Sequence, residues 1–434
     1  MRKLAANGDE MEEREERLRE EVERDLVMIE GGCVEIISRD ELGRKLLRSK
    51  QENRPLKIKV GFDPSAPDIH LGHTVQLRKM RQLQDMGHTV YYLIGDFTAR
   101  IGDPSGQKET RPNLTKAQVL ENASTYQKQA CKILDERKLQ LVFNSEWFDQ
   151  MTLPQIAELT SKYTVARLLE RDDFGKRLSE QKPITVLELL YALMQGYDSV
   201  RLGVDIEMGG TDQKFNLLVG RDLQRAYGQE PQVLIIMPLL VGTDGVQKMS
   251  KSLGNYIGIS EPPNEMYGKT MSISDDLMFE YSVFLTDIPR DDIDTMKESV
   301  HAGELNPKEV KKRLARELVR MYHGDKESVE AERAFERVFV EGGLPDDIPE
   351  LRLGPQHLKK DGTIWIVDLL IRAKFARTGN GARRLIDGGG VSIDGLKVDD
   401  TRLDIEPLNG MILRAGKRKF AKLVLEEHTA CSAD

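Results

Sequence analysis

The segment that constrains the fold most changes from strand-like to helix-like spacing and back again. Residues 56–62 alternate apolar and polar side chains, residues 72–86 repeat apolar side chains at helical spacing, and residues 89–96 form an apolar run. These patterns are typical of a strand, an amphipathic helix that ends at Gly87, and a buried strand. Such a βαβ unit is the seed of a parallel sheet, so we expect an α/β fold whose alternation continues to about Gly258.

The composition limits the class of protein. A chain of 434 residues is too long for one ordinary hydrophobic core, so we expect two or three domains. No apolar run approaches the roughly 20 residues that a membrane helix needs, and Glu/Arg runs stand where a secretory segment would be apolar. Three scattered cysteines fit a reducing cytosol, so we expect a soluble cytoplasmic protein. The net charge of −8 argues against indiscriminate nucleic-acid binding, but one domain could still carry a basic face.

The flanking segments differ from this α/β region. Residues 9–25 place Glu and Arg four apart, which is typical of a solvated helix, with a partner-binding arm as the alternative. Residues 261–340 are helical in pattern, and one helix should begin at the N-cap Asn306 and stop at Gly324. Residues 341–362 are rich in Pro, Gly and charge, which favours a linker.

The motif His70-Leu71-Gly72-His73 stands where the first strand of the unit gives way to its helix. A zinc site would need further ligands, but the other histidines form no cluster and no C-x-x-C occurs, so no metal site is expected. A satisfied structural turn is one alternative. The other is an anion site, because a helix N-terminus offers N–H donors and imidazoles add more. Gly72 would let a flat group lie against the backbone.

A second motif lies at residues 245–255, where Lys248 and Lys251 stand three apart in a Ser/Gly-rich loop. An ordinary surface loop is the plain alternative. Two lysines on a flexible loop could also deliver charge to a leaving pyrophosphate in the transition state. Residues 102–108, "GDPSGQK", do not fit the Walker spacing, so we reject a P-loop.

These motifs together carry a family resemblance. "HLGH" and "KMSKS" resemble the paired signatures of class I aminoacyl-tRNA synthetases, and H-x-G-H alone also occurs in nucleotidylyltransferases. The blocks "GFDPSAPDIHLGH", "GDFTARIGDPSG", "YALMQGYD" and "GGTDQKFN" resemble the bacterial tyrosyl-tRNA synthetases more specifically. The resemblance covers residues 30–427.

The resemblance implies roles for individual residues. His70 and His73 would hold ATP phosphate and stabilise the transition state, and Lys248 and Lys251 would contact pyrophosphate. ATP contacts are implied at Gly61, Asp63, His70, Gly72, His73, Met249, Ser250 and Lys251. Tyrosine contacts are implied at Asp63, Asp103, Tyr191, Gln195, Asp198 and Gln213, with Asp198 meeting the phenolic hydroxyl.

The spacing of three of these residues independently agrees with a shared pocket, since Tyr191, Gln195 and Asp198 lie on one helix face. A core aromatic and a helix-end cap are the plain alternatives for Tyr191 and Asp198.

The chain departs from the commoner family pattern at Lys59, where many members carry a Tyr that bonds the substrate hydroxyl. "GGTDQKFN" and "KMSKS" also differ from the commoner "GSDQWGN" and "KFGKT" and look like a second bacterial branch. The partner of Asp198 stays open, and we assign Lys59 no role.

The C-terminal module resembles the S4 RNA-binding domain, with two short helices, a triple glycine and a V-x-I-D-G hairpin. Residues 363–427 hold 12 Lys/Arg and 9 Asp/Glu, a net charge of +3 in a chain of −8. Concentrated basic charge indicates RNA binding, with a solvated basic face as the alternative. The expected tRNA contacts are Arg383, Arg384, Lys417, Arg418 and Lys419.

We therefore expect a Rossmann-type, doubly wound parallel sheet with a helical domain and a small α/β S4-like domain. The expected parts are an N-terminal helical extension (1–55), the catalytic domain (56–260), a helical anticodon-side domain (261–345), a linker (346–362) and the S4-like domain (363–428). The resemblance implies ATP-dependent activation of tyrosine, with Mg²⁺ accompanying ATP and no tightly bound cofactor, then transfer to tRNA by a homodimer. A tryptophanyl enzyme would lack the S4-like module and the Tyr191/Asp198 pair, and a non-catalytic RNA-binding relative would lose one of the two signature motifs.

Overall fold

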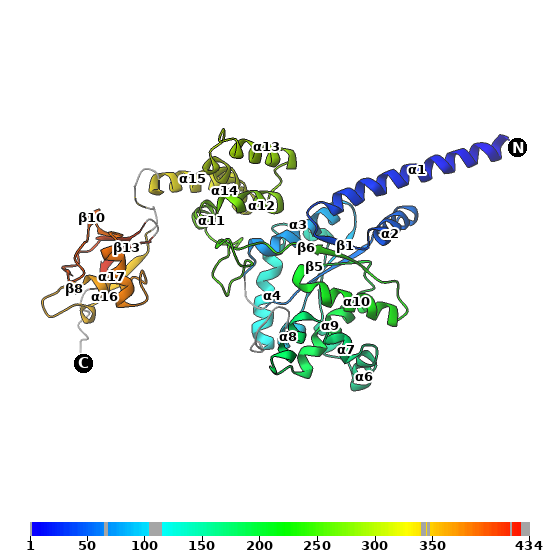
Figure 1. Ribbon diagram of the computed structural model, residues 1–434, viewed down its shortest axis with the longest axis horizontal. Coiled ribbons are helices and arrows are strands. Elements are labelled where there is room, and N and C mark those ends of the chain that lie inside the picture. Colours follow the sequence, from blue (N-terminus) through cyan, green and yellow to red (C-terminus); the bar gives the residue numbers. More distant parts are fainter. Residues whose placement is uncertain are drawn as a thin grey trace, which may run out of the picture. The chain divides into compact units, whose positions relative to one another are not determined.

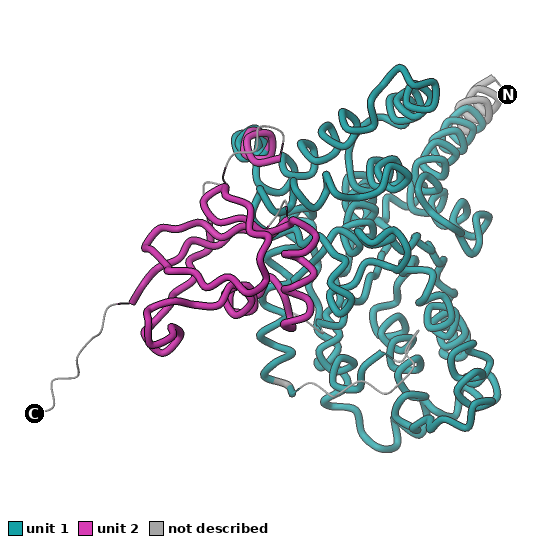
Figure 2. Tube along the Cα trace, turned by 60° about the vertical axis from the view of Figure 1, so that its left-hand side comes forward, with its two compact units in different colours: residues 1–331 teal, residues 332–434 magenta. Residues whose placement is uncertain are grey.

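The computed structural model describes residues 2–64, 68–103, 115–339, 344, 348–416 and 419–426. The chain forms two compact units, residues 1–331 and 332–434, shown in different colours in Figure 2. Two expected tRNA contacts, Lys417 and Arg418, lie outside the described residues. Within the described part of the chain, no helix is long and apolar enough to cross a membrane.

Unit 1 is built on a six-stranded sheet in the order β1-β6-β5-β2-β3-β4. All neighbouring strands are parallel except β1, which runs antiparallel to β6. The strands are β1 (Glu35–Ile37), β2 (Lys57–Phe62), β3 (Thr89–Ile94), β4 (Leu139–Phe143), β5 (Ile206–Gly210) and β6 (Val233–Met237). The sequence prediction of an α/β fold with a parallel sheet is confirmed.

The strand order reverses between β2 and β5. The chain proceeds from β2 outward to β3 and β4, and later from β5 outward to β6 on the other side. Helix α3 (Leu71–Asp85) follows β2 and helix α10 (Lys214–Ala226) follows β5. Because parallel crossovers are right-handed, these two helices cover opposite faces of the sheet, as Figure 1 shows. The carboxyl ends of β2 and β5 therefore border the crevice where open α/β sheets bind ligands.

Helix α9 (Val186–Leu202) begins and ends as its sequence dictates. Thr185 and Glu188 form a capping box at its start, and Gly203 takes the left-handed conformation at its end (φ 59°). The helix packs along α10. The two axes come close because Gly196 faces Gly220, and a Cβ added at Gly196 would lie 3.1 Å from the Gly220 Cα.

Most of the other helices lie in two stretches of the chain, and the last of these helices continues past residue 331, the end of unit 1. The stretch between β3 and α9 contains η1 (Thr98–Arg100), α4 (Lys116–Ala130), η2 (Glu136–Lys138), α5 (Ser145–Phe148), α6 (Leu153–Ser161), α7 (Val165–Leu168) and α8 (Asp172–Ser179). The helical stretch contains α11 (Pro263–Met271), α12 (Asp275–Leu285), α13 (Arg290–His301), α14 (Pro307–His323) and α15 (Asp325–Phe339). The prediction for α14 is confirmed, since the Asn306 side chain caps its start and Gly324 follows its end.

The N-terminal segment is not only helical. Helices α1 (Arg2–Glu30) and α2 (Arg39–Glu52) flank β1, which pairs with β6 and forms one edge of the six-stranded sheet. Lys79 of α3 holds the end of α1, since its Nζ donates to the carbonyls of Ile29 (3.0 Å) and Gly31 (2.7 Å). The segment before residue 56 is therefore joined to the same sheet.

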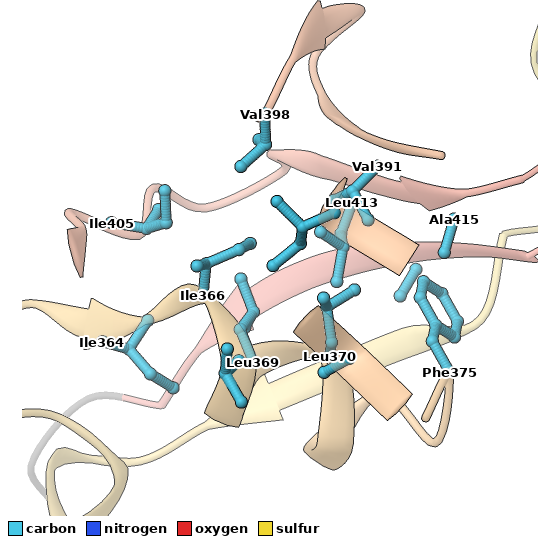
Figure 3. Packing of buried hydrophobic residues seen from close by; sticks show 14 of the residues in the cluster. Ile364, Ile366, Leu369, Leu370, Phe375, Val391, Val398, Ile405, Leu413 and Ala415 are labelled. Atoms are coloured by element: carbon cyan, nitrogen blue, oxygen red, sulfur yellow. The ribbon is translucent and has the colours of Figure 1, made fainter. Parts of the chain in front are cut away.

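Unit 2 has a five-stranded sheet in the order β10-β9-β12-β13-β7 and a second, two-stranded sheet of β11 and β8. Leu369, Leu370 and Leu413 lie in its apolar core (Figure 3). Its elements are β7 (Glu350–Leu353), η4 (Pro355–His357), β8 (Ile364–Trp365), α16 (Ile366–Arg372), α17 (Gly379–Asp387), β9 (Val391–Ile393), β10 (Leu396–Lys397), β11 (Asp404–Ile405), β12 (Ile412–Ala415) and β13 (Lys419–Leu425).

The linker expected over residues 346–362 instead contributes a strand. β7 pairs in parallel with β13 and buries Leu353 in the unit's core. Four residues between Pro- and Gly-rich stretches are too short for a local pattern to reveal, and their partner lies about 70 residues later in the chain. The compact fold of unit 2 therefore begins before the boundary expected at Thr363.

The close approach of α9 and α10 gives a test of the packing. Gly196→Ala should destabilise unit 1 by about 1–3 kcal/mol, because the added methyl group would overpack the interface. The matched control is Gly268→Ala in α11, where an added Cβ meets nothing within 4 Å. That variant should be neutral or gain up to about 1 kcal/mol from helix propensity. Urea unfolding of both variants measures the difference, and equal midpoints would contradict the interface.

Candidate active site

The two histidines cap the start of α3 and lie against each other. His70 is the N-cap, its Nδ1 accepts from the Gly72 N–H (3.2 Å), and its own N–H donates to His73 Nδ1 (3.2 Å). The rings stack with centroids 3.9 Å apart. Because both Nδ1 atoms accept, each neutral ring carries its proton on Nε2. The pair therefore offers two oriented N–H donors beside a helix N-terminus.

Both imidazoles are neutral at physiological pH. Burial, the neighbouring His73 and the Lys251 cation lower the pKa of His70 to about 2. Burial and Lys251 lower the pKa of His73 to about 4. These rings can donate hydrogen bonds to an anion, but the positive charge at the site has to come from elsewhere.

The loop that carries Lys248 and Lys251 is tied down by a residue the sequence analysis did not single out. Asn255 accepts from the Ser250 N–H (2.8 Å) and donates to the Lys248 carbonyl (3.1 Å). Met249 is buried, and its N–H donates to the Leu240 carbonyl. Asn255 closes the same stretch, "KMSKSLGN", and this position at the end of the loop was the available signal.

The two motifs meet through the backbone. Leu71 N–H donates to the Ile257 carbonyl (2.9 Å), and Ile259 N–H donates to the Ile69 carbonyl (3.0 Å). The Lys251 Nζ donates to the carbonyl of Asp68, just before the histidines. A Cβ at Gly72 would lie 3.0 Å from the His70 ring and 3.5 Å from the Met249 side chain, so glycine suits this position. The structure thus brings the histidine pair and Lys251 together.

Lys248 lies at the other strand of the crevice. Its Nζ forms an ion pair of 2.9 Å with Asp212 in the turn η3 (Thr211–Gln213), directly after β5. Lys248 therefore lies at the turn that follows β5, whereas Lys251 reaches the segment between β2 and α3.

Asp63 leaves the carboxyl end of β2 and meets α9. Its Oδ2 accepts from the Tyr191 hydroxyl (2.8 Å) and its Oδ1 accepts from Thr98 Oγ1 (2.8 Å). Burial and the Asp63 carboxylate raise the pKa of Tyr191 well above its ordinary value, so the hydroxyl stays a donor. A Cβ at Gly95 would collide with the Asp63 carboxylate, which explains the glycine after β3. Gly61, two residues earlier on β2, is exposed.

Asp198 is the most deeply buried carboxylate among the expected site residues, at 2% exposed. Its Oδ1 accepts from Trp147 Nε1 (3.0 Å) and its Oδ2 accepts from Asn144 Nδ2 (3.3 Å). Burial raises the pKa of Asp198 to about 7, although the Lys59 cation and the two donors act in the opposite direction. Sequence reasoning missed Asn144 and Trp147, yet Asn144 directly follows β4 and stands at the same sheet edge.

A chain of amides connects the other expected tyrosine contacts. Asn216 Nδ2 donates to Gln195 Oε1 (3.1 Å) and to Gln213 Oε1 (3.2 Å). Gln213 Nε2 donates to Asp103 Oδ2 (2.7 Å). Asn216 is buried and was not predicted, although it closes the block "GGTDQKFN". The structure therefore joins Gln195, Gln213 and Asp103 into one polar network.

The described tRNA candidates belong to unit 2 and are separate from these residues. Arg383 and Arg384 are exposed on α17, and the Arg383 guanidinium lies 5.3 Å from the centre of the Trp365 ring. Lys419, at the start of β13, donates to the Phe375 carbonyl (2.7 Å). Residues 383 and 384 thus present basic charge on one helix.

The chain is similar to known proteins over most of its length. The family model described as "tRNA synthetases class I (W and Y)" matches residues 50–340. A tyrosine–tRNA ligase of Moorella thermoacetica is 52% identical over 407 residues, covering 94% of this chain and 97% of the relative. A tyrosine–tRNA ligase of Thermotoga maritima is 50% identical over 401 residues, covering 92% and 97%.

Solved structures agree at the level of the fold. A C-terminally truncated mitochondrial tyrosyl-tRNA synthetase of Aspergillus nidulans matches with a TM-score of 0.62 at 20% identity, covering 76% of this chain and 100% of that one. The tyrosyl-tRNA synthetase of Archaeoglobus fulgidus complexed with L-tyrosine matches with a TM-score of 0.57 at 23% identity, covering 71% and 99%. The chain therefore belongs to the class I aminoacyl-tRNA synthetases, within the tyrosine–tRNA ligase family.

Proposed function

We propose that this chain activates L-tyrosine with ATP and then transfers the tyrosyl group to the 3′-terminal adenosine of tRNA(Tyr). In the first step a tyrosine carboxylate oxygen bonds to the α-phosphorus of ATP, and the bond to pyrophosphate breaks. The observation that carries the choice of tyrosine is the buried carboxylate of Asp198 on the helix face that also holds Tyr191 and Gln195. Pyrophosphate exchange with each of the twenty amino acids tests it, and exchange driven best by another amino acid would refute it.

Polar groups at two points along α9, beside Tyr191 and at Asp198, suit the two ends of tyrosine. Asp63 and Asp103 supply negative charge for the ammonium group, while Asp198 lies two helical turns beyond Tyr191 and accepts from the phenolic hydroxyl. A carboxylate has about four acceptor positions, and Trp147 and Asn144 use two of them. Gln195 and Gln213 face the reacting part of the amino acid through their shared amide network.

The phosphates of ATP are held by the histidine pair and the lysine loop. His70 and His73 donate from Nε2 as neutral rings, and the start of α3 adds its dipole. Lys248 and Lys251 neutralise the charge that grows on the leaving pyrophosphate. Mg²⁺ enters with ATP as part of the substrate. The remaining proposed ATP contacts are Gly61, Asp63, Gly72, Met249 and Ser250.

Unit 2 and the helices before it supply the proposed tRNA contacts. We assign residues 56–260 to catalysis, 261–345 to the anticodon side and the S4-like unit to RNA binding through Arg383, Arg384 and Lys417–Lys419. The exposed positions of Arg383 and Arg384 and the net charge of +3 over residues 363–427 support this assignment. Cysteine usage fits a cytoplasmic enzyme.

A second copy of the chain is the proposed partner in a homodimer. Each of the helices α6 to α9 exposes at least one large apolar side chain, and apolar side chains that gather on a surface are typical of interaction sites. These side chains are Leu153, Val165, Leu178, Val186 and Leu187. A paired subunit would cover this surface.

The role of the lysine loop leads to a kinetic prediction. Lys251→Ala should slow tyrosyl-adenylate formation roughly 10²- to 10³-fold, because its charge is needed where pyrophosphate leaves. Tyrosine affinity should be nearly unchanged. Single-turnover rates and equilibrium tyrosine binding measure the two effects, and Lys128→Ala, at an exposed lysine of α4, controls for the loss of charge. A large loss of tyrosine affinity with an unaltered rate would refute the assignment.

The buried carboxylate leads to a prediction about specificity. Asp198→Ala should reduce the tyrosine-over-phenylalanine ratio of kcat/KM by about 1.5–3 kcal/mol, the value of a hydrogen bond to a charged group. Trp147 and Asn144 still donate to Asp198 when phenylalanine binds, so the carboxylate is never left bare and the effect stays within this range. Pyrophosphate exchange with both amino acids measures the ratio. If the folded variant keeps the wild-type ratio, Asp198 is a structural residue.

The S4-like unit leads to a prediction about tRNA. Removing residues 344–434 should leave tyrosine-dependent pyrophosphate exchange intact and reduce tRNA charging by roughly tenfold or more, because phosphate contacts are lost. The cut precedes β7, since a cut at Thr363 would remove β13 and leave β7 without its partner. In the intact chain, Arg383→Glu with Arg384→Glu should raise the KM for tRNA alone. Full charging by the truncated protein would contradict this role.

A further inference from the structure

Lys59, the residue at which this chain departs from the commoner family pattern, is a buried cation at the reversal of the sheet. It is 1% exposed, and its Nζ lies 2.8 Å from Oε1 of Glu207, which is also 1% exposed. Lys59 stands on β2 and Glu207 is its register partner on β5. The ion pair therefore bridges the two strands between which the strand order turns.

The same pair holds α9 at two points. Lys59 Nζ donates to the carbonyl of Gln195 (3.1 Å), and Oε2 of Glu207 accepts from the Ser199 hydroxyl (2.9 Å). Gln232 Nε2 donates to the same Glu207 oxygen. Asp198 lies between Gln195 and Ser199 on this helix. A shift of the pair would therefore move the backbone on both sides of Asp198.

We propose that the Lys59–Glu207 pair positions the carboxylate of Asp198, and that it thereby sets how well the enzyme distinguishes tyrosine from phenylalanine. The inference rests on the proposed role of Asp198 as the acceptor for the phenolic hydroxyl. Lys59 acts through Asp198: Glu207 and the Gln195 carbonyl already accept from its ammonium, so it is a positioning residue.

The charges around Asp198 support this role. Lys59 on β2 and Glu207 on β5 act on it from the sheet, Tyr191 lies on the same helix, and the neutral donors Asn144 and Trp147 complete its surroundings. Lys59 lowers the pKa of Asp198 and opposes the effect of burial. Without Lys59 that pKa should rise above about 7, and more of the carboxyl would be protonated at neutral pH.

The alternative is that the pair only stabilises the sheet, and a matched lysine separates the two roles. Lys79 resembles Lys59 in being buried and in donating to backbone carbonyls. Its acceptors lie at the end of α1, however, and not on α9. Lys79→Met should lower stability without altering amino-acid choice. Lys59→Met should alter both.

The experiment compares four variants of the full chain: Lys59→Met, Lys59→Met with Glu207→Gln, Lys79→Met, and Asp198→Ala. The double variant leaves no uncompensated buried charge, so it should fold even where the single change does not. The readouts are kcat/KM for tyrosine and phenylalanine in pyrophosphate exchange between pH 6 and 9, with melting temperature as the folding control.

Both Lys59 variants should lose roughly tenfold or more of the tyrosine-over-phenylalanine ratio at pH 7. In Lys59→Met the acidic limb of kcat/KM for tyrosine should move to higher pH, because kcat/KM reports the free enzyme's groups and the pKa of Asp198 rises. In the double variant this shift should be smaller, because Glu207, which raises the pKa of Asp198, is neutralised as well. The inference is overturned if Asp198→Ala lowers the ratio but the folded Lys59 variants keep the wild-type ratio and pH profile. If Asp198→Ala leaves the ratio unchanged, the proposed role of Asp198 fails first and the inference falls with it.

Discussion

The reversal of strand order between β2 and β5 is the constraint on which the site depends. It places the carboxyl ends of two neighbouring strands at one crevice, so Asp63 after β2 and Gln213 after β5 meet there although 150 residues separate them. Lys59 and Glu207 pair across the same boundary. A register slip of one residue in either strand would turn that strand's side chain to the other face and break the pair.

The site separates its neutral hydrogen-bond donors from its positively charged groups. The histidine rings are fixed by their mutual hydrogen bonds and are neutral, so they orient an anion without neutralising it. The positive charge lies on Lys248 and Lys251, in a loop whose ends are held by Asn255 and by the backbone pairing of residues 257–259 with 69–71. Under the proposed function, this arrangement would suit a reaction in which negative charge grows on a leaving pyrophosphate, because the neutral donors would position the substrate and the lysines would stabilise the departing product.

The proposed specificity rests on buried polar groups more than on apolar shape. Asp198, Glu207 and Lys59 are each nearly inaccessible to solvent, and each has partners from a different element. Buried ionic groups of this kind add little net stability, because desolvation offsets their attraction. Their value lies in geometry, since a fully bonded network has few alternative arrangements. Placing the carboxylate that we propose accepts from the phenolic hydroxyl within such a network would make its position sensitive to residues that do not contact the amino acid.

The sequence by itself determined what depends on near neighbours. The βαβ pattern, the ends of α14 at Asn306 and Gly324, the shared face of Tyr191, Gln195 and Asp198, and the two signature motifs all follow from spacing within a few helical turns. Tertiary structure alone decided which distant groups meet: Lys59 with Glu207, Asp198 with Trp147 and Asn144, Asp63 with the bare backbone of Gly95, and β7 with β13. These partners are brought together by strand order and by the crossing of α9 over the sheet. No local period encodes that order, because it results from how the whole chain buries its apolar faces.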